Sequence, residues 1–332
     1  MAPRDQGSFR DPASTAARLT FVACERDHGG GLDAARARWG GAVEDWIDLS
    51  TGINPEPYPL PTFTDRDWTA LPDRDARQAL EHAARRFWNV PDGAAVLAAP
   101  GASALIARIP ALLPAGSVDI PGPTYNEHAA AFTAAGWTLA EGAADARVLV
   151  HPNNPDGRRW SAADASAPLT VIDESFCDVA PEISLMSLAA RPGTIVLRSF
   201  GKFWGLAGLR LGFAMGDPNL LARLAGMLGP WPVAGPALRV GAAALADPDW
   251  AARTRGRLAA DAAQLDGLLA PHGTCVGGTD LYRLFDVGDA AAMQDRLARH
   301  RIWSRVFPYS TGWLRLGLPP RDGWERLERT LA

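Results

Sequence analysis

Short apolar segments alternate with amphipathic segments through the middle of the chain. Residues 73–88 repeat apolar positions at helical spacing behind an acidic first turn, which predicts a surface helix. "ALIARIPALL" predicts another. Short apolar-biased runs, each closed by a turn residue, predict buried strands. These runs are "AAVLAA", "SVDI", "RVLV", "LTVI", "TIVL" and "RLGFAM". The alternation predicts an α/β fold with a mostly parallel central sheet and helices on both faces.

The pattern changes near Pro230. Residues 236–270 predict one or two long helices rich in Ala, Arg and Leu. After them, "DLYRLFDV", "RIWSRVF" and "WLRLGL" predict strands, with a helix near 289–300 and a terminal helix. This α+β pattern is typical of a second, smaller domain. We expect an N-terminal leader and arm over 1–45, a large domain over 46–230, and a small C-terminal domain over 231–332 with its linking helices.

Composition and charge exclude several classes of function. The 332 residues carry a net charge of −4 without a basic block, so we expect no nucleic-acid partner. No apolar run reaches the ~18 residues of a membrane span, and no secretory h-region is present, so we expect a cytoplasmic protein. Cys24, Cys177 and Cys275 lie far apart, and the histidines lack metal-ligand spacing. We expect neither a disulfide framework nor a bound metal.

The most informative polar residues fall where the predicted strands end. In open α/β sheets, ligands bind beyond the carboxyl ends of the strands. Each such residue alone also fits an ordinary turn, cap, core contact or ion pair. The set comprises Gly101, Ala102, Ser103, Tyr125, Asn154, Asp173, Ser199 and Lys202.

The segment "LRSFGKFWGLAGLRLG" places Lys202 among glycines and apolar residues, between Ser199 and Arg210. Apolar, cation-rich surroundings lower the pKa of a lysine, so that its amine can form an imine. Together, the residues at the strand ends supply a phosphate cup, an aromatic lid, a phenolic-oxygen contact, a carboxylate and this lysine. That combination predicts pyridoxal 5'-phosphate (PLP) as the cofactor.

"SFGKFWGLAGLRLG", with "PGAS", "PTYNE", "PNNPDG" and "IDESF" upstream in that order, resembles the fold-type I PLP enzymes of the class I/II aminotransferase superfamily. The resemblance spans roughly residues 46–318. It implies two catalytic residues, Lys202 as the Schiff-base lysine and Asp173 as the partner of the pyridine nitrogen. It implies that the other cofactor-binding residues contact the phosphate, the ring or the phenolic oxygen. These are Gly101, Ala102, Ser103, Tyr125, Asn154, Phe176, Ser199 and Arg210.

The same resemblance implies a homodimer and a substrate carboxylate held by Arg315 in "GWLRLGLP". Two positions depart from the family pattern. Phe176 stands where many relatives carry a tyrosine that contacts the phenolic oxygen. Leu71 stands where relatives often carry a tyrosine that reaches the partner subunit's cofactor phosphate.

"RDHGGGLDAARARWG" and "WIDLSTGINPEPYP" resemble the N-terminal region of the L-threonine O-3-phosphate decarboxylases of cobalamin biosynthesis. This branch forms (R)-1-amino-2-propanol O-2-phosphate, so the expected substrate is a small phosphorylated amino acid. Backbone, hydroxyl, amide and imidazole groups here could bind it, although His28 fits a plain loop residue almost as well. The candidate substrate-binding residues are His28, Gly29, Gly30, Ser50, Thr51, Asn54 and Arg315.

Two alternatives stay open at this point. One is an aminotransferase similar to histidinol-phosphate aminotransferase, because the shared cofactor residues do not choose which bond of the substrate α-carbon breaks. A preference of ~1.4 kcal/mol between two substrate orientations changes that choice tenfold. The other is a non-catalytic ligand sensor, which the presence of Lys202 and the lack of a helix-turn-helix pattern both disfavour.

Overall fold

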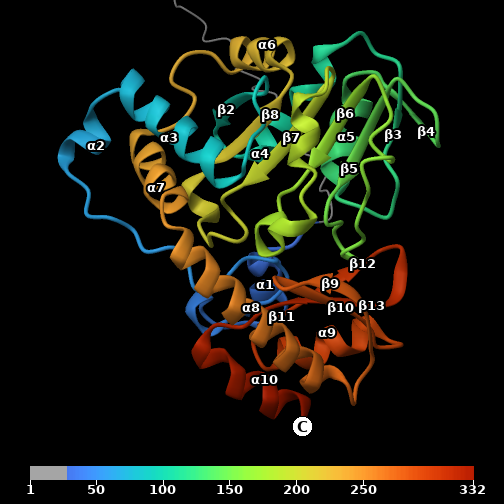
Figure 1. Ribbon diagram of the computed structural model, residues 1–332. Helices are drawn as coiled ribbons and strands as arrows, with labels where there is room; N and C mark the ends of the chain where they lie inside the picture. Colours follow the sequence, from blue (N-terminus) through green and yellow to red (C-terminus); the bar gives the residue numbers. More distant parts are fainter. Residues whose placement is uncertain (1–27) are drawn as a thin grey trace, which may run out of the picture.

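The computed structural model describes residues 28–332 and centres on a seven-stranded sheet (Figure 1). Its strand order is β2-β8-β7-β6-β5-β3-β4. The run from β7 to β4 is parallel, whereas β8 pairs antiparallel with both β2 and β7. The predicted mostly parallel α/β fold is therefore confirmed. The strands are β2 (Ala95–Ala99), β3 (Ser117–Asp119), β4 (Thr138–Ala140), β5 (Ala146–Val150), β6 (Leu169–Asp173), β7 (Thr194–Ser199) and β8 (Gly212–Gly216).

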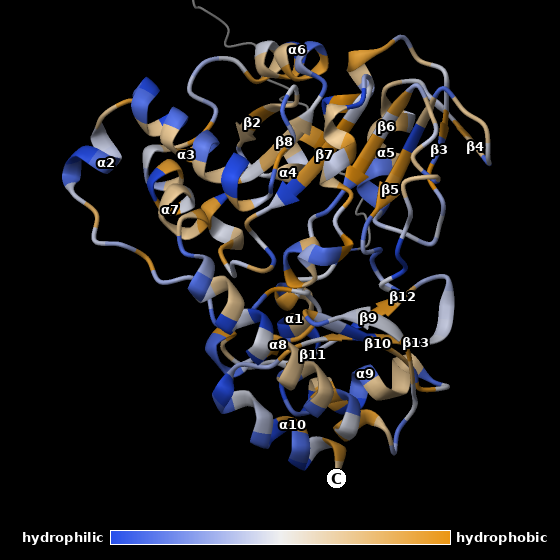
Figure 2. Cartoon of the chain, in the orientation of Figure 1, coloured by the Kyte–Doolittle hydropathy of each residue, from blue (hydrophilic) through white to orange (hydrophobic). Residues whose placement is uncertain are grey.

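Helices cover both faces of this sheet because its strands are apolar on both sides. In β7, Ile195 and Leu197 pack into one core cluster and Val196 into the other. The first cluster includes α4 (Ala102–Ile106), α5 (Asn126–Ala134) and α6 (Pro218–Leu228), and the second includes α3 (Arg74–Phe87) and α7 (Gly235–Leu245). Figure 2 shows the apolar strands enclosed between the more polar outer helices.

A second, antiparallel sheet has the order β12-β13-β10-β9. Its strands are β9 (Thr274–Thr279), β10 (Tyr282–Asp286), β12 (Arg305–Phe307) and β13 (Ser310–Gly317). The adjoining helices are α8 (Pro248–Leu269), α9 (Ala290–Arg299) and α10 (Trp324–Leu331), with α1 (Leu32–Trp39) against α9. The short strand β1 (Ile47–Asp48) pairs with β11 (Ile302–Trp303), so the first residues after the arm lie beside the C-terminal part. The predicted domain limits stay a prediction.

Two local predictions differ from the structure, and a third, which left one or two helices open, is resolved by it. "ALIARIPALL" is not one helix: α4 ends at Ile106 and a 3₁₀ turn (Ile109–Leu112) follows, because Pro110 cannot continue an α-helical hydrogen-bond ladder. "RIWSRVF" forms two short strands instead of one. Residues 236–270 form two helices, and Asp247 begins the second by accepting a hydrogen bond from the Trp250 N–H (2.9 Å).

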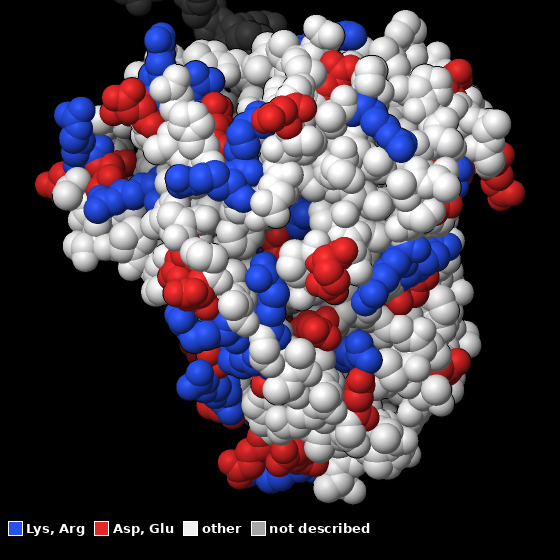
Figure 3. Space-filling model, viewed as in Figure 1, with Lys and Arg blue, Asp and Glu red and all other residues white. Residues whose placement is uncertain are grey.

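The visible surface carries acidic and basic side chains interspersed (Figure 3). Within residues 28–332, no helix has the length and apolar character needed to cross a bilayer. Most of the predicted leader, including Cys24, lies in residues 1–27, outside the described part of the chain.

Candidate cofactor and substrate site

A cavity of about 310 Å³ lies at the carboxyl ends of β5, β6 and β7. Residues predicted for the cofactor and residues predicted for the substrate meet in its wall, although they come from distant parts of the sequence. The predicted residues that line it are His28, Gly29, Thr51, Ala102, Ser103, Tyr125, Asn154, Asp173, Phe176, Ser199, Lys202, Arg210 and Arg315.

Lys202 lies on the turn after β7 and is partly accessible from the cavity. It is the only lysine in the sequence. Burial, assisted by the positive charges of Arg315 and Arg210, lowers the pKa of Lys202 to about 8, although Asp173 opposes the shift. About a tenth of this amine is therefore neutral, and nucleophilic, at about pH 7, far more than for an ordinary lysine.

Asp173 ends β6 with its carboxylate in the cavity wall and has a partner that the sequence analysis missed. His128 Nε2 lies 2.8 Å from Asp173 Oδ2, and the Ser175 hydroxyl donates to Oδ1 (2.5 Å). Burial alone would raise the pKa of Asp173, but His128 and Ser175 outweigh it and lower the pKa. Asp173 is thus held ionised. Tyr125 and His128 both lie at the start of α5, but the sequence alone does not distinguish His128 from an ordinary core histidine.

Arg315 on β13 is buried in the opposite wall. Its Nη1 donates to Asn154 Oδ1 and its Nη2 to the Ser50 carbonyl (2.6 Å). Its Nε has no hydrogen-bond partner among residues 28–332. Burial lowers the pKa of Arg315 to about 10. A buried guanidinium with an unused donor is suited to an anionic ligand.

Arg305 on β12 is a second arginine that the sequence analysis missed. It stands opposite Arg315 in the antiparallel register, so both side chains lie on the same face of the small sheet. Both line a side cavity of about 80 Å³, which also contacts His28, Tyr125 and Asn154. "RIWSRVF" contained the residue, but its pairing with Arg315 depends on a tertiary register.

Gly30 and Ser50 line an adjoining cavity of about 660 Å³ instead of the main one. The Gly30 N–H donates to Ser50 Oγ (2.7 Å), and that hydroxyl donates to Asp48 Oδ1 (2.6 Å). A Cβ on Gly29 would lie only 2.4 Å from the Ser50 carbonyl oxygen. These contacts hold the turn at Gly29 and Gly30 against Ser50, in the segment after β1. The backbone of this turn therefore borders the adjoining cavity.

Gly101 also lies just outside the cavity lining. Its φ of +86° is a conformation that favours glycine, and a Cβ there would lie 2.7 Å from Arg210 Nη2. Glycine at this position therefore allows the Arg210 side chain to lie against the start of α4, beside Ala102 and Ser103.

Asn54 is placed away from all the described cavities, behind the lysine turn. Its Nδ2 donates to the Phe203 carbonyl (2.9 Å), its Oδ1 accepts from Arg257 (2.5 Å), and its backbone N–H donates to the Lys202 carbonyl (3.0 Å). Its polar atoms are bonded within the protein because the chain turns inward at Asn54. The structure therefore gives Asn54 a supporting position instead of the predicted contact with substrate.

The two family departures have distinct settings. Phe176 is buried and packs edge-on against Tyr282, with ring centres 4.9 Å apart, and Lys202 Nζ lies 5.2 Å from the centre of the Phe176 ring. Its ring therefore packs against the lysine without offering a hydrogen bond. Leu71 is 68% exposed.

His28 stands at the mouth of the cavity. Its Nε2 lies 2.9 Å from Glu127 Oε1, its side chain is 43% exposed, and its ring centre is 6.1 Å from that of Tyr125. An exposed pair of this kind positions a side chain only weakly. His28 is therefore next to the site but not firmly fixed.

The donor set of the cavity fits PLP. Arg210 with Ser103 and Ser199 supplies donors for a phosphate group, and the ionised Asp173 suits a protonated ring nitrogen. The Tyr125 ring, whose burial raises the pKa of its hydroxyl to about 12, remains neutral beside them.

The fold and the donor set of the cavity are those of a PLP-dependent enzyme, and comparisons with known proteins agree with this class. The family model described as aminotransferase class I and II matches residues 146–327. The PLP complex of histidinol-phosphate aminotransferase from Sinorhizobium meliloti has a similar fold, with a TM-score of 0.78 at 20% identity over 96% of this chain and 98% of that one. The chain belongs to the class I and II aminotransferase family.

Two curated relatives are more similar in sequence. A threonine-phosphate decarboxylase from Sinorhizobium sp is 43% identical, and one from Pseudomonas aeruginosa is 40% identical. Each alignment covers 92% of this chain and 97% of the relative.

Proposed function

We propose that the chain is a PLP-dependent decarboxylase that converts L-threonine O-3-phosphate to (R)-1-amino-2-propanol O-2-phosphate, a step of cobalamin biosynthesis. The observation that carries the proposal is a pair of arginines on one face of the small sheet. Arg315 lines the cavity that holds Lys202, and Arg305 lines the side cavity that Arg315 also contacts. Two cations beside an amine suit an amino acid with two anionic groups. The similarity to relatives named threonine-phosphate decarboxylase supports the same substrate.

PLP supplies an electron sink for the bond that breaks at the substrate α-carbon. We assign Lys202 to its aldehyde, Asp173 to its pyridine nitrogen, Asn154 to its phenolic oxygen and Tyr125 to its ring face. The residues assigned to its phosphate are Ala102, Ser103, Ser199 and Arg210. His128 keeps Asp173 ionised, and an ionised carboxylate holds the ring nitrogen protonated.

On the substrate side, Arg315 binds the carboxylate and Arg305 binds the phosphate. A ligand held at both ends cannot rotate freely, so the two arginines together select which bond of the α-carbon faces the cofactor. Lys202, with a pKa of about 8, can then deliver a proton to the α-carbon after CO2 leaves. The enclosing wall formed by Phe176 and Tyr125 limits the access of water.

We also propose that the protein acts as a homodimer. Three exposed large apolar side chains support this, because apolar surface left exposed can mark a protein–protein interface. Trp68 lies in α2 (Asp65–Thr69), Leu71 lies in the loop after α2, and Trp231 follows α6; they are 68%, 68% and 57% exposed. Sedimentation equilibrium would test this, and a monomer at micromolar concentration would contradict it.

The deciding experiment measures CO2 release from O-phospho-L-threonine by the PLP-loaded protein, with and without 2-oxoglutarate. We expect release that does not depend on the oxo acid. Glutamate formation that requires the oxo acid, without CO2, would instead establish an aminotransferase. Lys202→Ala should lower the rate by at least about 10³-fold, because it removes both the amine and the proton donor.

The single lysine gives a second test of cofactor attachment. Borohydride reduction of the PLP-loaded protein should add one pyridoxyl phosphate to the Lys202 peptide, found by mass spectrometry. The Lys202→Ala variant should show no adduct within that peptide and no visible absorbance band. An unmodified Lys202 in the wild type would contradict the assignment.

A further inference from the structure

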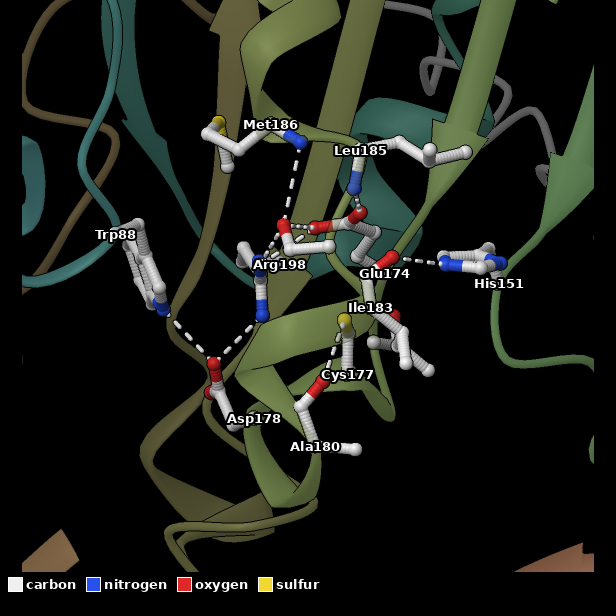
Figure 4. A network of polar contacts seen from close by, with 12 residues as sticks. Trp88, His151, Glu174, Cys177, Asp178, Ala180, Ile183, Leu185, Met186 and Arg198 are labelled. Carbon is white, nitrogen blue, oxygen red and sulfur yellow. Dashed lines mark hydrogen bonds and ion pairs between the residues drawn. The ribbon is translucent and has the colours of Figure 1, made fainter. Parts of the chain in front are cut away.

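Figure 4 shows a buried polar network around Arg198. The network is close in sequence to the lysine turn, and its residues do not line the cavity. At its centre Arg198 is 2% exposed and forks between two buried carboxylates. Its Nη2 lies 2.5 Å from Glu174 Oε2, and its Nη1 lies 2.7 Å from Asp178 Oδ1. Glu174 follows Asp173 in the chain, and Arg198 precedes Ser199, so the network is joined directly to the ends of β6 and β7.

The same network contains the one group of potential metal ligands found among residues 28–332, His151, Glu174 and Cys177. These side chains already have protein partners. Glu174 accepts from the Leu185 N–H (2.5 Å) as well as from Arg198, and His151 Nε2 lies 2.8 Å from the Ile183 carbonyl. Burial raises the pKa of Cys177 to about 12, which keeps its thiol protonated. Each of the three side chains therefore already has a partner within the protein.

Asp178 accepts hydrogen bonds from donors on several different elements. Besides Arg198, it accepts hydrogen bonds from two indoles: Trp88 Nε1 to Oδ1 (2.8 Å) and Trp204 Nε1 to Oδ2 (3.1 Å). Its backbone carbonyl accepts from Arg255 Nε on α8 (2.7 Å). A buried carboxylate with this many donors is fully compensated and fixed in place.

Two of the donors to Asp178, Arg198 and Trp204, lie on either side of Lys202 in the sequence. Arg198 stands just before the turn that carries Lys202, and Trp204 stands two residues after Lys202. Trp204 is fully buried and stacked between Phe200 and Trp250, with centroid distances of 5.1 and 5.3 Å. One carboxylate therefore ties down both ends of the segment that presents the lysine.

We propose that Asp178 is a positioning residue for Lys202, which acts by holding Arg198 and Trp204 at the two ends of the lysine turn. Its catalytic consequence rests on the proposed function, but its effect on Lys202 does not. If the turn loosens, the amine gains water and moves relative to Asp173, Arg210 and Arg315. Since burial is the main cause of the lowered pKa of Lys202, that pKa should then rise toward its ordinary value of 10.5.

The test compares Trp204→Phe with Trp88→Phe. Each variant removes one indole N–H from the same carboxylate and keeps an aromatic ring, but only Trp204 belongs to the lysine turn. The readout is the rate at which a small acylating reagent modifies Lys202 in the cofactor-free protein, followed by peptide mass spectrometry as a function of pH. No other side chain carries a primary amine, so the Lys202 peptide reports one group.

We expect the pH midpoint of labelling to rise by about 1 unit in Trp204→Phe and in Asp178→Asn, and to match the wild type in Trp88→Phe. In the PLP-loaded protein, Trp204→Phe should lower kcat about tenfold without changing KM, since its effect is on the lysine and not on substrate contacts. Equal midpoints in Trp204→Phe and Trp88→Phe would overturn the proposal and leave Asp178 a purely structural residue.

Thermal unfolding provides the control for general loss of structure. Both tryptophan variants should be destabilised to a similar extent. If the pH midpoint of labelling shifted in both variants in proportion to their loss of stability, the proposal would also be overturned. If Asp178→Asn does not fold, the two milder tryptophan variants decide the outcome. A wild type that binds no PLP would contradict the proposed function, whereas the labelling of the cofactor-free protein would still decide the role of Asp178.

Discussion

The two walls of the cavity are built in different ways. The cofactor wall, formed by Asn154, Asp173, Ser199 and Lys202, comes from the ends of neighbouring strands in one sheet. The substrate wall, formed by His28, Thr51, Arg305 and Arg315, comes from a loop before α1, the segment after β1 and two strands of the small sheet. Strand pairing fixes the first wall, whereas the packing of several separate elements fixes the second.

This contrast indicates which wall determines the cofactor chemistry and which determines the choice of substrate. Residues at the ends of one sheet keep their spacing as long as the sheet pairs, so the cofactor wall suits chemistry that the whole family shares. Residues from separate elements can change independently, so the substrate wall suits the choice of substrate. The predictions below ask whether damage to one wall leaves the other intact.

Among substitutions at the substrate wall, the largest effect is expected from Arg305→Ala. Loss of a charge-assisted contact with the phosphate should lower kcat/KM for O-phospho-L-threonine by about 10- to 100-fold. The visible absorbance of bound PLP should not change. Steady-state kinetics and absorbance spectra would check both. Arg299→Ala, which removes an exposed arginine of α9, is the matched control and should keep wild-type kinetics.

Asn54→Ala tests whether Asn54 belongs to the substrate wall or supports the lysine turn. Loss of its contacts with Phe203 and Arg257 should lower the free energy of unfolding by about 1–3 kcal/mol, measured by urea denaturation. KM for O-phospho-L-threonine should stay unchanged. A raised KM with unchanged stability would return Asn54 to the role predicted from sequence.

The lowered pKa of Lys202 predicts a dependence of stability on pH. The unfolded chain keeps this proton up to its ordinary pKa of 10.5, while the folded protein releases it near 8. The folded cofactor-free protein is therefore destabilised below pH 8 by this group, and gains stability between these two values as the pH rises. Lys202→Met should be more stable at neutral pH, by on the order of 3 kcal/mol, since each pKa unit corresponds to about 1.4 kcal/mol.

The denaturation curves of wild type and Lys202→Met should converge as the pH rises from 8 toward 10.5. A constant gap across this range would show that Lys202 is not the group responsible.

The smallest effect is expected from His28→Gln. Its side chain is 43% exposed, and a partly exposed ion pair contributes roughly 0–1 kcal/mol. We expect KM to rise by no more than about fivefold, with kcat unchanged. A loss as large as that of Arg305→Ala would place His28 in direct contact with the substrate phosphate.

The sequence predicted the cofactor wall well, because each of its residues follows an apolar run that reads as a strand. Asp173 and Lys202 needed only the rule that ligands lie beyond the carboxyl ends of such strands. His128 was missed although it lies one helical turn from Tyr125. A histidine in the Ala-rich segment "NEHAAAF" has no local pattern that distinguishes a ligand-site partner from a core residue.

The substrate wall was predicted only in part, because its residues meet through tertiary packing and not through local sequence patterns. Arg305 meets Arg315 through an antiparallel register, and a register is decided by turns and packing instead of local periodicity. Asn54 was predicted for the substrate because it belongs to the segment "WIDLSTGINPEPYP" and carries an amide that can form hydrogen bonds. Its inward direction depends on Phe203 and Arg257, which are far away in the sequence.

The single lysine also makes this protein a reporter of its own local opening. A protease that cuts only after lysine has one bond to attack within the whole sequence, between Lys202 and Phe203. Phe203 and Trp204 are fully buried, so that bond cannot enter a protease active site in the closed protein. The rate of cleavage would therefore follow the population in which the lysine turn has unfolded, which gives a free energy for that one segment.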